Sequence, residues 1–161
     1  EAIRDGMLSV AGTLDRRLGG QGFHLFDGDR ANVAHYHAKD ATGPAEWRRM
    51  IYLFKIRQEQ DAVFGSFDCP DGNQVIPTRS RSTTPLQALN LFNSRFTMQQ
   101  AQKLAERLGA HGDRVPQTYE LLYNRPATSD ERRDAEKFIG DHNFLAFCRA
   151  MLNTSEFLFI F

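Results

Sequence analysis

The hydrophobic positions at the start of the chain repeat every three or four residues, which is the period of one helix face. They are Ile3, Met7, Val10, Leu14 and Leu18. The pair Gly19-Gly20 follows directly and is a stop signal. The pattern therefore predicts an amphipathic helix that continues to residue 18.

The next part of the chain has no helical period. Residues 19–46 hold several glycines and the turn pair Gly43-Pro44, which predicts a long irregular loop of the kind that often carries function. Within it, His35-Tyr36-His37 has extended character. Residues 47–57, "WRRMIYLFKIR", are apolar on both faces, so we expect a buried strand there. A short buried helix is the alternative that periodicity leaves open.

The second half of the chain carries repeated helix-start signals. In a capping box, a Ser, Thr, Asp or Asn and a Glu or Gln three residues later each accept a hydrogen bond from the other's free backbone N–H. Four pairs fit this pattern: Thr84 with Gln87, Thr97 with Gln100, Thr128 with Glu131, and Asn153 with Glu156. The sequence thus predicts a mostly α fold: several short packed helices with a long irregular loop and a minor β element.

Length and charge limit the class of protein. The 161 residues suit one domain, 1–161, and the absence of a start methionine leads us to expect a fragment of a longer protein. Twenty basic residues balance twenty acidic ones, which argues against a nucleic-acid binder. No apolar run reaches the roughly 18 residues of a membrane span.

Two cysteines, Cys69 and Cys148, are too far apart for a zinc or haem-attachment motif. Two buried thiols are the simpler interpretation. A disulfide that ties the loop to the C-terminal helices is the alternative in an oxidising compartment.

The run "RSRSTTP" places Arg79 and Arg81 just before the helix start at Thr84. Unpaired N–H groups at a helix start and two guanidinium groups could together bind phosphate, sulfate or a carboxylate. The alternative is that the arginines pair with Asp68 or Asp71 in the preceding loop.

A metal site is a second candidate. His35 and His37 are two residues apart and would share one face of a strand. With His24, or with Asp68 and Asp71, they could ligate a metal ion. Surface histidines and a turn held by the aspartates explain the same residues without a metal.

Six runs along the chain resemble a known family. They are "EAIRDGML", "WRRMIYLFK", "FDCPDGN", "RSRSTTPLQALNLFNS", "LYNRPATSDE" and "FCRAMLNTSEFLF". The chain is similar to the PSD-one domain of unknown function, the C-terminal domain of large planctomycete and verrucomicrobial proteins associated with cytochrome c. This resemblance implies export to the periplasm or cell envelope. It places haem c in other domains of the parent protein and no cofactor in this chain.

The resemblance carries no catalytic residues, so two functions stay open. The first is a non-catalytic interaction or ligand-binding domain that packs against its parent's other domains or binds a polysaccharide or anionic ligand. The second is part of an enzyme acting on acidic or sulfated polysaccharide, or an electron-transfer accessory, with its site on loops 19–46 and 68–81.

Overall fold

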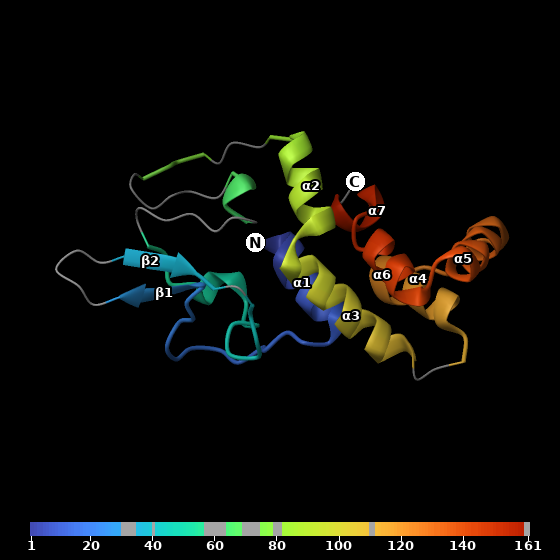
Figure 1. Ribbon diagram of the computed structural model, residues 1–161, viewed down its shortest axis with the longest axis horizontal. Coiled ribbons are helices and arrows are strands. Elements are labelled where there is room, and N and C mark those ends of the chain that lie inside the picture. The colour runs from blue at the N-terminus through green and yellow to red at the C-terminus, as the bar shows by residue number, and fades with distance from the viewer. Residues whose placement is uncertain are drawn as a thin grey trace.

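Helix α3 (Arg95–Gly109) lies at the centre of the protein, and most other helices pack around it (Figure 1). The computed structural model describes residues 1–29, 35–39, 41–56, 64–68, 75–78, 82–109 and 112–159. Helix α3 contacts α1 (Ala2–Ala11), α2 (Pro85–Asn93), α4 (Arg114–Tyr123) and α6 (Phe144–Met151). Helix α5 (Ser129–Asp141) packs on α4 and α6, and the short α7 (Ser155–Leu158) packs on α4.

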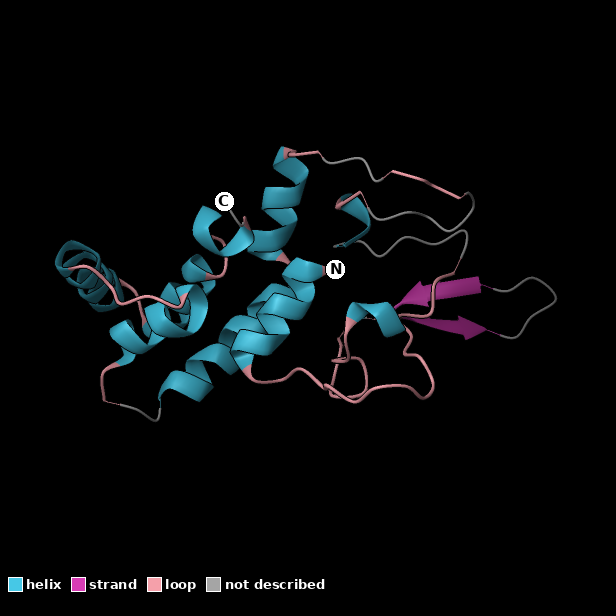
Figure 2. Ribbon diagram, turned by 180° about the vertical axis from the view of Figure 1, so that it is seen from behind, coloured by secondary structure: helices cyan, strands magenta, loops and turns pink. Residues whose placement is uncertain are grey.

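The β structure is a single hairpin among the described residues. Strand β1 (Phe26–Asp29) pairs antiparallel with β2 (His35–Ala38), and Asp27 lies opposite His37. The hairpin projects from the side of the protein that lies away from α4, α5 and α6 (Figure 2). Many helices with one small sheet confirm the predicted fold class. In the described part of the chain, none of the helices has the length and apolar character needed to span a membrane.

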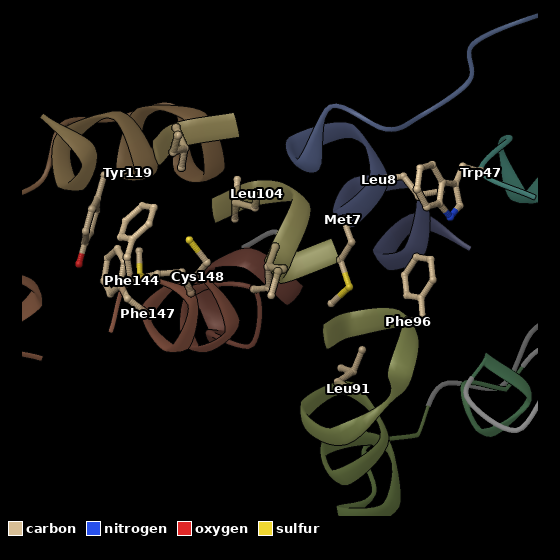
Figure 3. Packing of buried hydrophobic residues seen from close by; sticks show 14 of the residues in the cluster. Met7, Leu8, Trp47, Leu91, Phe96, Leu104, Tyr119, Phe144, Phe147 and Cys148 are labelled. Carbon is tan, nitrogen blue, oxygen red and sulfur yellow. The ribbon is translucent and has the colours of Figure 1, made fainter. Parts of the chain in front are cut away.

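The core runs through the protein along α3. Met7, Leu8, Trp47, Leu91 and Phe96 pack on one side of Leu104 (Figure 3). On its other side lie buried residues of the C-terminal helices: Tyr119, Phe144, Phe147 and Cys148. Leu104 itself is fully buried, so α3 joins both groups into one continuous core.

The first helix is shorter than predicted. It ends at Ala11, because Gly12 adopts the left-handed conformation (φ 74°) and its N–H donates to the carbonyls of Leu8 and Ser9. This is a glycine helix terminus, and it acts seven residues before Gly19-Gly20. Leu14 still packs against the core, but Leu18 is 81% exposed. The helical period beyond residue 11 was therefore misleading.

Two predicted capping boxes are confirmed, at Thr84 with Gln87 before α2 and at Thr128 with Glu131 before α5. The other two predicted helix starts are wrong by one or more residues. Helix α3 begins after Ser94, whose Oγ accepts from Thr97 N, so Thr97 is a buried residue of the first turn.

Helix α7 starts after Thr154 rather than Asn153. The Thr154 side chain accepts from Phe157 N, whereas Asn153 donates to the carbonyl of Arg149. Glu156, the expected partner of Asn153, binds Arg125 instead. Tertiary partners have thus replaced the local pairing on which the prediction depended.

The strand predicted for residues 47–57 is absent from the described part of that run, residues 47–56. Met50–Tyr52 make one turn of 3-10 helix, η1, between two isolated bridges, Asp15 with Arg48 and Phe23 with Leu53. Trp47 and Met50 are buried three residues apart, whereas Ile51 is 76% exposed. The core therefore takes up only some of the side chains of this apolar run.

No sheet orders the described residues 12–25 and 41–56, which we call the irregular segment. Two buried arginines hold it in place instead. Arg4 on α1 donates from Nη1 to the carbonyl of Arg48 (2.8 Å) and from Nη2 to that of Glu46 (2.5 Å). Arg48 donates in turn to the carbonyls of Arg17, Gly19 and Gln21. Loop carbonyls that no strand can pair are satisfied in this way.

Candidate functional site

The two histidines of the predicted metal site lie on β2. Both are exposed, and His37 faces Asp27 across the hairpin. His24 instead stacks on Phe54, with ring centroids 4.7 Å apart. Among the residues that the structure describes, no three His, Cys, Asp or Glu side chains are grouped so as to hold a metal ion. His35, His37 and Asp68 thus form no such group, and Asp71 lies outside the described residues.

Asp68 lies instead beside the start of α2. Its carboxylate accepts from the Ser82 backbone N–H (2.6 Å) and from Ser82 Oγ (3.0 and 2.9 Å). Asp68 is itself in the left-handed region, with φ 52°. This conformation costs a non-glycine residue about 1 kcal/mol or more, so the hydrogen bonds to Ser82 hold a strained residue in place.

The predicted anion site is only partly described. Thr84 Oγ1 accepts from Gln87 N, and Gln87 Oε1 accepts from Thr84 N (3.0 Å). The Gln87 amide group also donates to Ser66 O and to Ser82 Oγ. The hydroxyl of Thr84 is therefore used for capping, and a carboxylate of the protein itself, that of Asp68, already lies beside this helix start. Arg79 and Arg81 lie outside the described residues, so their role stays a prediction.

Helix α2 buries one face and exposes another. Gln87 and Leu91 are buried, and Leu91 points into the core beside Met7 and Phe96 (Figure 3). Three apolar side chains face solvent: Leu86 is 56% exposed, Leu89 57% and Phe92 43%. We call Leu86, Leu89 and Phe92 the α2 face.

The α2 face is continuous along the helix. Its members are three residues apart, so they follow one side of the helix over roughly 9 Å at 1.5 Å per residue. Single exposed apolar residues are ordinary, but an aligned row of large ones on a helix is typical of a contact surface.

Arg149 from α6 bounds the α2 face at its C-terminal end. Its guanidinium carbon lies 3.9 Å from the centroid of the Phe92 ring. Its Nε donates to Phe92 O and its Nη2 to Asn93 Oδ1, each at 2.8 Å. A cation at the last carbonyls of a helix is also favoured by the helix dipole. The charge is held rigidly beside the apolar side chains.

Sequence reasoning overlooked this surface. The run "PLQALNLF" is apolar enough to supply both a core face and a solvent face, and only the fold decides between them. One signal was available: the positions 86, 89 and 92 keep a period of three, separate from the buried positions 87 and 91.

Two features of the described residues bear on possible chemistry. A shallow depression of about 340 Å³ lies between α3 and α4, lined by Arg107, Leu108, Gln117, Glu120 and Leu121. Arg107 is occupied there with the carbonyls of Ser9 and Val10. Cys148 is a free thiol, but it is fully buried and burial raises its pKa to about 12, so it is no nucleophile at neutral pH. Cys69, its partner in the alternative of a disulfide, lies outside the described residues.

Comparison with known proteins assigns a family. The model of the PSD1 family, described as "Protein of unknown function (DUF1553)", matches residues 1–139. The chain belongs to the PSD1 family. No curated protein and no solved structure matches the chain.

The match covers the α2 face and the irregular segment that the buried arginines hold. Helices α6 and α7 follow the matched residues, and α6 supplies Arg149. The family description names no activity, so the function has to be argued from the surface of the domain.

Proposed function

We propose that this PSD1 domain is a non-catalytic interaction domain that binds another protein segment through the α2 face. The observation that carries this proposal is the aligned exposure of Leu86, Leu89 and Phe92 on one side of a helix whose other side is anchored in the core. Binding would remove these side chains from water, which is favourable by about 25 cal/mol per Å² of apolar surface.

From the family resemblance we further propose the setting of this interaction. The partner segment would belong to other domains of an exported, cytochrome c-associated parent protein of planctomycete type, in the periplasm or cell envelope. Haem c would then reside in those domains. The alternatives of an enzyme for acidic or sulfated polysaccharide and of an electron-transfer accessory gain no supporting observation from the described residues.

Site-specific photo-crosslinking tests the proposal in the full-length protein in its own cells. A photoreactive amino acid replaces Leu89, and in a matched control it replaces Lys137, an exposed residue of α5. We expect position 89 to form one dominant crosslink to a protein segment, identified by mass spectrometry, and position 137 to form none. Diffuse crosslinking that is the same at both positions would overturn the proposal.

A further inference from the structure

We propose that the segment bound at the α2 face is an amphipathic helix whose apolar side chains are flanked by carboxylates. This inference rests on the proposed function, and it adds the chemistry of the partner. Three observations carry it: the charge around α2, the unused donors of Arg149, and the shape of the α2 face.

The chain around α2 is depleted of acids. Residues 72–105 contain no Asp or Glu, although the whole chain of 161 residues has twenty. The same stretch has four basic residues: Arg79, Arg81, Arg95 and Lys103. The acid described at the N-terminal end of α2, Asp68, is already hydrogen-bonded to Ser82. A partner with acidic residues would meet little repulsion from this stretch of the chain.

Arg149 offers hydrogen-bond donors at the opposite end of α2. A guanidinium has five N–H groups, and those of Arg149 make two side-chain hydrogen bonds among the described residues, to Phe92 O and Asn93 Oδ1. Three N–H groups remain for a carboxylate. The stacking on Phe92 fixes the guanidinium plane, so little side-chain freedom is lost when an acid binds.

The α2 face has the form of a helix ridge. Residues three apart on a helix form a row that fits between the side-chain rows of a second helix. A peptide helix with apolar residues at positions i, i+3, i+4 and i+7 is a common complement to such a surface. Its acidic residues would border the apolar stripe and reach Arg149.

The same charges argue against a second copy of this chain as the occupant. In a twofold pair of α2 faces, the identical patch of each copy contributes to the interface. Such an interface would hold two positive Arg149 side chains, and residues 85–93 of either copy offer no carboxylate to pair with them. An acidic partner removes this repulsion.

Fluorescence anisotropy with two labelled peptides tests the inference. Both peptides are helical and have leucine at the same positions, but the flanking residues are glutamate in one and lysine in the other. We expect the glutamate peptide to bind about tenfold or more tightly than the lysine peptide. We expect Leu89→Ser to weaken both peptides, and Arg149→Glu to remove the preference for the acidic one.

Two controls separate charge from folding. Arg133→Glu changes an exposed arginine on α5, away from the α2 face, and should leave both affinities unchanged. Because Arg149 also supports the end of α2, the milder Arg149→Gln is measured as well, and circular dichroism confirms that each variant is folded. The preference of the wild type should also fall as salt is raised.

Each other outcome overturns the inference in a recognisable way. Equal binding of both peptides, lost in Leu89→Ser, keeps the interaction domain but refutes an acidic partner. Binding of neither peptide refutes the helical acidic partner, whereas the crosslink at position 89 still decides the proposed function. Preferential binding to phosphatidylglycerol vesicles over the glutamate peptide identifies a membrane surface instead.

Discussion

Replacing Arg4 with methionine should loosen the irregular segment from the helices. Arg4 is 1% exposed, and it donates to the carbonyls of Glu46 and Arg48. Its guanidinium carbon also lies 5.0 Å from the ring centroid of Phe23 and 5.4 Å from that of Phe96. Methionine has a similar length but no donor, so the two carbonyls would lose these partners while the core stays filled.

The magnitude follows from these contacts. A hydrogen bond from a charged donor contributes roughly 1.5–3 kcal/mol, so two contribute roughly 3–6 kcal/mol. Removing a buried guanidinium also removes its desolvation penalty, which offsets part of that loss. We therefore expect Arg4→Met to lower the free energy of unfolding by about 2–4 kcal/mol. The exposed Arg133→Met should change it by less than about 0.5 kcal/mol.

Urea titration measures the total loss, and amide hydrogen exchange locates it. Three backbone bonds of the segment depend on the anchored position: Asp15 N to Trp47 O, Phe23 N to Tyr52 O, and Phe54 N to Phe23 O. In Arg4→Met, exchange at the amides of Asp15, Phe23 and Phe54 should speed up relative to the wild type. Exchange at the amides of α4 should speed up less, because the irregular segment would open before the helices.

Two results would refute this reasoning. A loss below about 1 kcal/mol would mean that the carbonyls of Glu46 and Arg48 find other partners at little cost. A uniform increase in exchange across α4 and the irregular segment would mean that Arg4 supports the whole core. Its effect would then not be limited to the contact between the irregular segment and the helices.

Three further predictions concern the C-terminal helices. Thr128→Ala should destabilise the protein by about 1 kcal/mol in urea titration, because Glu131 N loses its acceptor, whereas the exposed control Thr83→Ala should not. The hydrogen bonds from the Arg125 side chain and the Thr128 backbone N–H lower the pKa of Glu131 from 4.5 to about 2. A depressed folded pKa contributes stability above the unfolded value, so the advantage of wild type over Glu131→Gln should shrink as pH falls from 4.5 to 2, and a pH-independent difference would contradict this. The Cys148 thiol should resist iodoacetamide at neutral pH in the folded protein and react in denaturant; rapid reaction of the native thiol, followed by mass spectrometry, would disprove its burial.

The sequence was sufficient where a structural choice depends on neighbouring residues. At Thr84 and Thr128 the capping side chain and its Gln or Glu partner are three residues apart, and both boxes form. At Asn153 the same spacing failed, because Arg125 provides a stronger, charged partner for Glu156. The competing residue is 31 positions away, and no local pattern contains it.

The irregular segment was beyond local reasoning for a related reason. A buried strand and an irregular chain use the same apolar residues, and the difference lies in what satisfies the backbone carbonyls. Arg4 and Arg48 satisfy them here, and a sequence pattern usually assigns arginine to the surface. In the described residues 47–56 the predicted strand is absent, because buried arginines supply the donors that a neighbouring strand would otherwise supply.

The α2 face shows how the same limitation affects function. Leu91 and Phe92 are adjacent and both large, yet one is buried and the other stands at the surface under a guanidinium. The fold decides between them: α2 packs on α3, whereas from α6 the Arg149 side chain reaches Phe92 at the end of α2. Arg149 supports the end of α2 with two of its donors among the described residues, and in our proposal the other three bind the partner. If the acidic partner is confirmed, the residue that completes the fold around α2 is also the residue that selects what binds there. A charge reversal at Arg149 should then change the choice of partner more strongly than the free energy of unfolding.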